Sequence, residues 1–288
     1  MAASGIDVKT VKKLLEESLL KLGFEVYTLK KLADAAALSF SFSDSFCAAC
    51  CQVGWYNSVL PPKLHLPHPD DCLAVVVLST PSMFEHAFLP FMEERGCQGL
   101  SDPIDQCVKH CVTSALSQSF PGLKVDVRFD YELLPTRKPK FLAQTAAHVS
   151  GAAFYYQQSD VSDQPWANKK MFGVCVHPRL GGWFAIRALL VFQDIKMNPE
   201  ELQPEPPDCV PSRDARIQLL EDFNLRWQDW SYRNIITPTV TYSKKQQDYF
   251  STPPAQRHTL LRSWGLLSEL DDAPSHNSRE QAQVNGHG

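Results

Sequence analysis

Four residues that could contact a ligand recur at helical spacing in residues 141–157 of this 288-residue chain. Gln144, His148, Gly151 and Tyr155 stand at i, i+4, i+7 and i+11, which places them on one stripe of a helix. The stripe is small and polar and is ringed by aromatic residues, so it predicts a surface on which a large planar ligand could lie. Taken alone, His148 fits a hydrogen-bonded core histidine as well as it fits a ligand contact.

A second segment, residues 173–187, contains two apolar runs separated by the turn sequence Pro-Arg-Leu-Gly-Gly. The pattern predicts a β-hairpin whose second strand ends on Arg187. Cys175 lies in the middle of the first run with no base arranged beside it, which favours a buried, inert thiol over a nucleophile. A turn beside a strand explains His177 and Arg179 without catalysis. Together, the helix and the hairpin leave room for a planar ligand between them.

Charge and motif patterns exclude several classes of function. The net charge of -4 leaves no basic surface for nucleic acid or for an anionic membrane. The sequence has no glycine-rich phosphate loop, no HExxH motif and no GxSxG motif, so nucleotide hydrolysis, zinc proteolysis and α/β-hydrolase chemistry lack support. Nine cysteines at irregular positions predict a reduced protein in the cytoplasm.

The pattern of apolar residues predicts helices interleaved with strands. Strands are predicted at 24–27, 73–79 and 123–134, and helices at 8–22, 82–89, 105–116 and 216–230. Residues 198–211, rich in proline and acidic side chains, predict a loop. This order is typical of one layered α+β or α/β domain, and 288 residues can bury a single substantial core.

Longer motifs carry a resemblance to a known family. The sequences AQTAAHVSGAA and GVCVHPRLGGWFAIR, the upstream LSTPSMF and DPIDQCV, and the downstream DCVP, FN, DWSYR and YFSTPPAQR are similar to the cobalamin-processing family of methylmalonic aciduria and homocystinuria type C. The resemblance is collinear over about residues 8–27 and 52–260. It implies an α+β fold: a single flavin-reductase-like or nitroreductase-like domain with a mostly antiparallel sheet and flanking helices.

The resemblance implies a cytoplasmic enzyme that is also a cobalamin chaperone. Its activities would be reductive removal of cyanide from cyanocobalamin with reduced flavin, FAD or FMN, and transfer of alkyl groups from alkylcobalamins to glutathione. Cobalamin would be held base-off, with its benzimidazole tail displaced from cobalt. The implied partners are the type D cobalamin-trafficking protein, the cobalamin-dependent methionine synthase system and a second copy of the chain in a ligand-dependent homodimer.

Individual residues also acquire roles from the resemblance and from the helical stripe. The expected cobalamin-binding positions are Asp130, Phe141, Leu142, Ala143, Gln144, His148, Tyr155, Tyr156, Gln157, Cys175 and Ile186. Arg187, Arg233 and Arg257 match the family's glutathione-contacting arginines, and planar guanidinium groups suit the two carboxylates of that tripeptide. A surface salt bridge is the alternative for each arginine. The chain supplies no metal ligand and no catalytic thiol, since cobalt arrives within cobalamin and the thiol within glutathione.

The loop of Pro135, Thr136, Arg137, Lys138 and Pro139 resembles the family's dimer-contact loop. Two prolines stiffen the loop, and its two cations could reach a partner's carbonyl groups. An exposed turn explains the same residues equally well.

Residues 28–51, rich in Ala, Ser, Phe and Cys, are the main departure from the family. We interpret this stretch as an insertion, and a retained intron or a misplaced exon boundary is our hypothesis for its origin; an ordinary surface loop is the alternative. Its cysteines, Cys47, Cys50 and Cys51, have no second ligand pair at zinc spacing. The processing domain is therefore predicted to span 1–263 around this insertion, and residues 264–288 to form a disordered tail.

Two other functions fit part of the pattern. A flavin-dependent, nitroreductase-like oxidoreductase would bind flavin tightly and leave the spectrum of cobalamin unchanged. A non-enzymatic carrier would bind cobalamin and leave methylcobalamin intact in the presence of glutathione.

Overall fold

The structure, a computed structural model, describes residues 6–27, 50–96, 102–197 and 205–267. Its centre is a five-stranded antiparallel sheet in which the order is β1-β3-β7-β4 and β2 also pairs with β3. The strands are β1 (Phe24–Tyr27), β2 (Cys50–Gln52), β3 (Cys72–Ser79), β4 (Val125–Phe129) and β7 (Ala185–Lys196). The predicted antiparallel α+β architecture is confirmed, whereas the flavin-reductase-like assignment stays a prediction.

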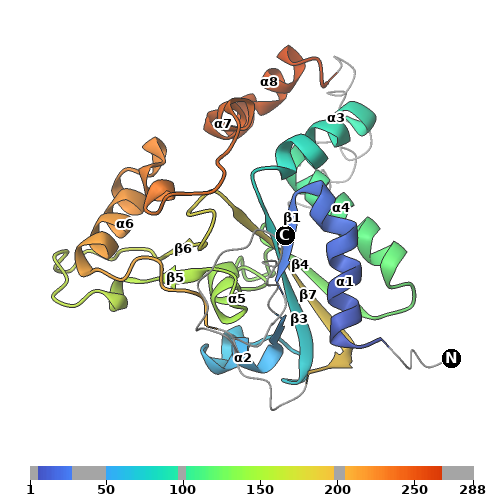
Figure 1. Cartoon of the computed structure of the whole chain (residues 1–288), viewed down its shortest axis with the longest axis horizontal. Helices are drawn as coiled ribbons and strands as arrows, with labels where there is room; N and C mark the ends of the chain where they lie inside the picture. Colours follow the sequence, from blue (N-terminus) through green and yellow to red (C-terminus); the bar gives the residue numbers. More distant parts are fainter. Residues whose placement is uncertain (1–5, 28–49, 97–101, 198–204, 268–288) are drawn as a thin grey trace, which may run out of the picture.

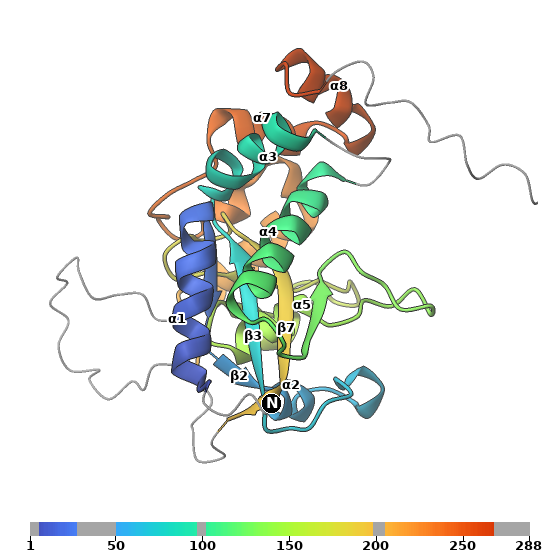
Figure 2. The ribbon, with the colours of Figure 1, turned by 90° about the vertical axis from the view of Figure 1, so that its right-hand side faces the viewer.

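Helices cover both faces of this sheet (Figure 1). One face packs on α1 (Val8–Leu19) and α4 (Pro103–Ser119), which Figure 2 shows side by side across the strands. The same core continues past the end of the sheet, where Tyr249 of α7 (Lys244–Ser251) contacts Phe84 and Phe88 and α8 (Arg257–Ser263) follows. The other face packs on α2 (Val53–Ser58) and α5 (Ala143–Val149). Every residue of β3 is buried because its alternate side chains enter different cores, which explains its continuous apolar sequence.

A smaller two-stranded sheet lies beside the main one. It pairs β5 (Phe154–Tyr156) with β6 (Val174–Val176) and packs on α6 (Arg213–Leu225). The predicted hairpin across residues 173–187 is therefore wrong in its pairing: β6 pairs with β5, and β7 joins the main sheet. The chain closes a tight turn between His177 and Gly181 and then redirects into β7.

The predicted helix across residues 141–157 is also shorter than expected. It ends at Val149, and Gly151 follows with a left-handed φ of 73°, a conformation that stops a helix. Tyr155 consequently stands on β5 instead of on the helical stripe with Gln144 and His148.

The remaining elements mostly follow the apolar pattern. Residues 82–89 form one π-helical turn, Phe84–Phe88, which continues as α3 (Leu89–Arg95). The strand predicted over 123–134 ends at Phe129. Short 3-10 segments span Leu20–Leu22, Pro62–Leu64, Gln158–Asp160, Trp227–Asp229, Ser231–Asn234 and Pro254–Gln256.

The ends of the predicted domain are extended slightly by the structure. Leu266 and Leu267 are buried in the core of the α1 and α4 face, so packing continues past the boundary predicted at 263. The rest of the predicted tail, residues 268–288, and residues 198–204 of the predicted loop lie outside the described residues. Within the described ranges, we find no helix with the length and apolar character that a membrane crossing requires.

β1 and β2 are two parts of one interrupted strand. Tyr27 stands opposite Val76 of β3, and Cys50 stands opposite the next residue, Val75. The pairing register therefore continues as if Cys50 followed Tyr27 directly. This corrects the predicted boundary of the insertion, because Cys50 and Cys51 belong to the sheet; residues 28–49, including Cys47, lie outside the described residues.

Deleting residues 28–49 should stabilise the protein, because joining Tyr27 to Cys50 preserves the register and removes a loop whose closure costs about 2 kcal/mol. We expect the melting temperature to rise by about 4–8 °C. Deleting residues 28–51 is the matched comparison: it joins Tyr27 to Gln52 and would draw α2 about 7 Å along β3. A lower melting temperature for the shorter deletion than for the full chain would show that the segment packs into the fold.

Candidate functional site

The face of α5 gathers most of the residues predicted to contact a planar ligand. The buried Tyr56 hydroxyl accepts a hydrogen bond from the Leu142 backbone N–H at 2.8 Å, which fixes the start of α5. The Cys175 thiol lies 3.7 Å from the Gln144 carbonyl oxygen, and Tyr155 pairs with Cys175 across β5 and β6. α5, β5 and β6 therefore present one continuous surface.

One apolar cluster, in which α5 packs on the strands, contains most of the residues predicted to bind cobalamin. Its predicted members are Phe141, Leu142, Ala143, Tyr155, Cys175 and Ile186. Burial raises the pKa of the Cys175 thiol, which keeps it protonated and agrees with an inert thiol.

His148 has the structural partner that the sequence could not reveal. Its Nδ1 accepts a hydrogen bond from the Tyr155 backbone N–H at 3.2 Å, and its ring meets Phe154 edge-on at 5.0 Å. Burial lowers the pKa of His148, so the neutral ring carries its proton on Nε2. His148 thus joins the end of α5 to the start of β5 and leaves only Nε2–H for a ligand.

A β-bulge turns Arg187 away from the α5 face. Val77 pairs with Ala188 and Leu78 pairs with Ile186, so Arg187 is the extra residue in β7. Ile186 and Leu189 pack in the α5 cluster, and regular alternation from Leu189 would place residue 187 there too. The bulge instead directs its guanidinium to the α4 side, which is a known use of bulges near functional sites.

The buried Arg187 has few partners for its five N–H donors. Its Nε donates to the Ser79 hydroxyl at 2.9 Å, and its Nη1 lies 3.9 Å from Asp130 Oδ2. Asp130 Oδ1 is itself buried and makes no hydrogen bond with the described residues. A buried cation with unused donors, beside a poorly matched carboxylate, is suited to binding an anion.

Arg257, the first residue of α8, adds a second guanidinium to this charge cluster at the N-terminal turn of α4. Arg257 Nη1 donates to Asp102 Oδ2 at 2.6 Å, and Asp102 also caps α4 by accepting from the Ile104 N–H. Asp105 interacts electrostatically with Asp102, Asp130, Arg187 and Arg257. Burial, together with the two neighbouring carboxylates, raises the pKa of Asp105 to about 6 against the opposing effect of the arginines.

Arg233 lies among aromatic rings. Its guanidinium carbon is 5.1–5.6 Å from the ring centres of Trp183, Trp230, Tyr232 and Tyr242. Its Nη1 donates to the Gly182 carbonyl oxygen, and its Nε is buried with no hydrogen-bond partner among the described residues. The rings favour the cation and exclude water, which strengthens any contact with an anion.

The aromatic cluster connects Arg233 to Arg257. Tyr242 meets Phe250 at 5.5 Å, and Arg257 lies 5.8 Å from the Phe250 ring and 5.0 Å from the Tyr249 ring. Ring contacts therefore run from Arg233 to Arg257, and electrostatic interactions through the carboxylates at the start of α4 link Arg257 to Arg187. The three predicted arginines belong to one connected region.

Other predicted residues lie apart from this region. The Tyr156 side chain is fully buried in the cluster beneath α6 and donates to Asp208 Oδ1 at 2.7 Å, while Gln157 is exposed and its backbone N–H binds Asp160. Residues 135–139 form an ordered turn, closed by the Leu133–Pro139 bridge.

Sequence reasoning missed several residues that build the site. They are Tyr56, Ser79, Asp102, Asp105, Trp183, Trp230 and Tyr242. Both aspartates lie in a motif that carried the family resemblance, and that was the signal available for them. Ser79 lies in another of those motifs, LSTPSMF, whereas Tyr56 gave no signal, because its partner is distant in the sequence.

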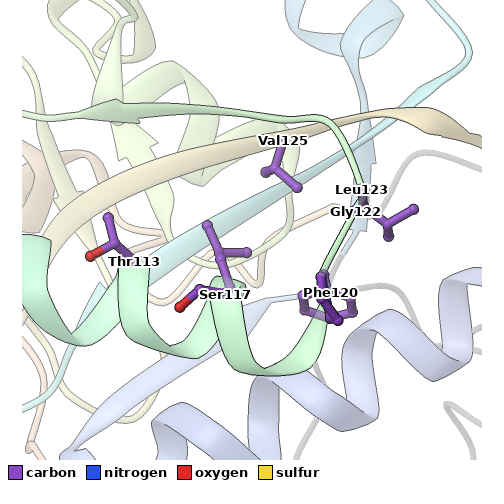
Figure 3. A pocket seen from close by; sticks show the side chains of 8 residues that line it. Thr113, Ser117, Phe120, Gly122, Leu123 and Val125 are labelled. Atoms are coloured by element: carbon purple, nitrogen blue, oxygen red, sulfur yellow. The ribbon is translucent and has the colours of Figure 1, made fainter.

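A cavity elsewhere on the molecule contains none of the predicted residues. It has a volume of ≈ 410 Å³, lies at the C-terminal end of α4, away from Asp102, and is bounded by Phe120 and Val125 (Figure 3). The described residues also contain no cluster of His, Cys, Asp or Glu that could hold a metal ion.

Comparison with known proteins places these observations in a family. Residues 45–261 match the model of the Methylmalonic aciduria and homocystinuria type C family. A zebrafish (Danio rerio) protein named cyanocobalamin reductase / alkylcobalamin dealkylase is 53% identical over 93% of this chain and 99% of its own length. A human protein of the same name is 46% identical over 93% of this chain and 86% of its own length.

A solved structure agrees with the fold. The crystal structure of a B12-trafficking protein CblC from C. elegans superposes with a TM-score of 0.74 and 29% identity, and covers 89% of this chain and 96% of the other.

Asp105→Asn should stabilise the protein at neutral pH, because the wild-type carboxylate must ionise in a half-buried, acidic neighbourhood. A raised folded-state pKa means that wild-type stability falls as the pH rises from about 4 through 6. After allowance for its partial exposure, we expect a gain on the order of 1 kcal/mol at pH 7.5 that vanishes below pH 4. Urea unfolding at both pH values measures it, with the exposed Asp194→Asn as control; a gain equal at both values would contradict the assignment.

Proposed function

The chain belongs to the methylmalonic aciduria and homocystinuria type C family, and from that premise we propose that it removes the upper axial ligand of cobalamins. The proposed reactions are reductive decyanation of cyanocobalamin and transfer of alkyl groups from alkylcobalamins to glutathione. One observation carries the proposal: the apolar α5 face and the buried arginine cluster adjoin at consecutive residues, Ile186 and Arg187. Because these two residues lie at the beginning of β7, a planar substrate on the α5 side of the sheet and an anionic thiol on the α4 side would both reach the end of this strand.

The α5 face would bind the corrin ring of cobalamin. The apolar contacts would come from the small Ala143, the flat ring of Tyr155 and the aliphatic Ile186. The exposed Gln144 and the Nε2–H of His148 are available to polar groups at the rim of the macrocycle. α5 packs on the strands through the buried Ala146 and Ala147, so a benzimidazole beneath the ring would have to displace this packing. Base-off binding would follow, and loss of the lower axial ligand makes cobalt easier to reduce.

The arginine cluster would bind the carboxylates of glutathione. In the dealkylation, the thiol loses its proton, the thiolate sulfur attacks the cobalt-bound carbon, and a thioether forms. The cobalt–carbon bond breaks with its electron pair left on cobalt, which gives cob(I)alamin, so atoms and electrons balance. Arg187 and Arg257 would hold the tripeptide by exchanging their present carboxylate partners, Asp130 and Asp102, for those of the ligand.

Reduced flavin would supply the electrons for decyanation. The described residues include no recognisable phosphate-binding loop for a flavin nucleotide. We therefore propose that flavin binds transiently as an electron donor, and we assign no residue to its site. We further propose a cytoplasmic location and delivery of the processed cobalamin to the type D trafficking protein and the methionine synthase system.

The spectrum of methylcobalamin tests the proposal directly. Purified protein should convert bound methylcobalamin to its yellow, base-off form, and added glutathione should then remove the methyl group. An unchanged base-on spectrum at saturating protein would refute the binding mode. A base-off spectrum that persists with glutathione would instead identify a non-enzymatic carrier, and tight flavin binding without any cobalamin change would identify a flavin-dependent oxidoreductase.

Arg187→Gln, Arg233→Gln and Arg257→Gln should each slow glutathione-dependent dealkylation by about tenfold or more, because each removes a charge-assisted contact that contributes roughly 1.5–3 kcal/mol. Their affinities for methylcobalamin should change less. Arg213→Gln is the matched control, since Arg213 binds the backbone oxygens of Ser162 and Asp163, outside the cluster. If the variants dealkylate normally but fail in flavin-driven decyanation, the arginines serve the flavin and not glutathione.

The loop at residues 135–139 supports the further proposal of a ligand-dependent homodimer. Its turn holds Arg137 at a positive φ of 61°, and Leu133 and Leu134 beside it are exposed. Sedimentation velocity should show dimers when cobalamin is added, and Arg137→Ala combined with Lys138→Ala should weaken them. An unchanged dimer fraction in the double variant would leave these residues as an exposed turn only.

A further inference from the structure

The turn that precedes β7 is organised around the imidazole of His177. Its Nδ1 accepts hydrogen bonds from the backbone N–H groups of Arg179 at 3.1 Å and Leu180 at 3.2 Å. Reciprocal backbone hydrogen bonds of 2.8 and 2.9 Å join His177 to Gly181. Because Nδ1 accepts twice, the proton of the neutral ring must lie on Nε2.

Nε2 of His177 points toward a carboxylate on the neighbouring edge strand. It lies 3.6 Å from Glu25 Oε2 on β1, and the other oxygen of Glu25 accepts from Arg179 Nη2 at 2.8 Å. His177 is 1% exposed, and burial lowers its pKa, so the neutral tautomer persists. Glu25 therefore fastens both the imidazole and the turn to the main sheet.

The far side of this turn supports Arg233. A Cβ atom on Gly181 would stand 2.4 Å from the Arg233 carbonyl oxygen, and one on Gly182 would stand 2.8 Å from the Arg233 Cα. Gly182 N–H donates to that carbonyl at 3.0 Å, and the Gly182 carbonyl oxygen accepts from Arg233 Nη1. Only glycine permits this approach, so the position of the turn sets the position of Arg233 at both backbone and guanidinium.

We propose that His177 is a positioning residue for Arg233: together with Glu25, it fixes the turn at residues 177–182 and so holds the guanidinium where the aromatic rings and an anionic thiol ligand meet. The proposal rests on the function proposed above, in which Arg233 contacts glutathione. His177 itself touches no reacting atom. A merely structural role would lower stability without changing the environment of Arg233 or the demand for glutathione.

Four variants of the full chain separate these roles: His177→Leu, His177→Asn, Glu25→Ala and Arg233→Gln. Leucine removes both contacts of the imidazole, whereas asparagine keeps an acceptor oxygen near the place of Nδ1. Three readouts apply: tryptophan emission, to which Trp183 and Trp230 beside the cation contribute two of the six indoles; methylcobalamin affinity; and the KM and kcat for glutathione in dealkylation.

Arg233→Gln sets the reference change in emission. We expect His177→Leu to reproduce that change and to raise the KM for glutathione about five- to tenfold, with a smaller effect on kcat and on methylcobalamin affinity. His177→Asn should return the KM to within about twofold of wild type. Glu25→Ala should shift emission and KM in the same direction as His177→Leu. If the leucine variant does not fold, Glu25→Ala tests whether the turn positions Arg233.

Wild-type emission and KM in a folded His177→Leu or Glu25→Ala variant would overturn the proposal. Equal defects in His177→Leu and His177→Asn would also overturn it, because the acceptor would then be irrelevant. An unchanged KM in Arg233→Gln would remove Arg233 from the proposed glutathione site, and the emission data would still test whether His177 positions it.

Discussion

The antiparallel pairing of β3 with β7 organises the rest of the molecule, because both strands are buried between two layers of helices. Burying one large aliphatic side chain contributes about 1.5–3 kcal/mol, so a pairing buried on both faces resists displacement. The single extra residue in β7, Arg187, is tolerated at this rigid place. It exchanges the faces that residues 186 and 187 would otherwise occupy, so Ile186 joins the apolar α5 face and Arg187 the charged α4 face.

The site combines an apolar surface with a cluster of partly desolvated charges. The α5 face is apolar and shaped by small residues, whereas the α4 face holds one buried and one partly buried guanidinium group among three carboxylates, Asp102, Asp105 and Asp130. These ions are imperfectly matched: Asp130 stays 3.9 Å from Arg187, and Asp105 is a weaker acid than usual. A cluster tuned only for stability would pair its charges more closely, so the mismatch favours a role in ligand exchange.

The sequence predicted much of this fold where local pattern decides structure. The apolar run of β3 and the amphipathic α1 were visible, whereas the antiparallel class came from the family resemblance. One error arose where long-range pairing decided, because β6 joined β5 instead of β7. The other was local: Gly151 stopped the helix whose stripe included Tyr155. The arginines were found through family motifs, while the bulge that aims Arg187 leaves no trace in residue type, because it depends on register between distant strands.

Methyl transfer to glutathione is the central claim, and isotope labelling measures it most directly. The purified full chain would be given methylcobalamin with a ¹³C-labelled methyl group and excess glutathione under anaerobic conditions, and the products would be identified by mass spectrometry. The account predicts one labelled S-methylglutathione for each cob(I)alamin formed. Labelled methane, or methylcobalamin that stays bound and intact, would contradict it.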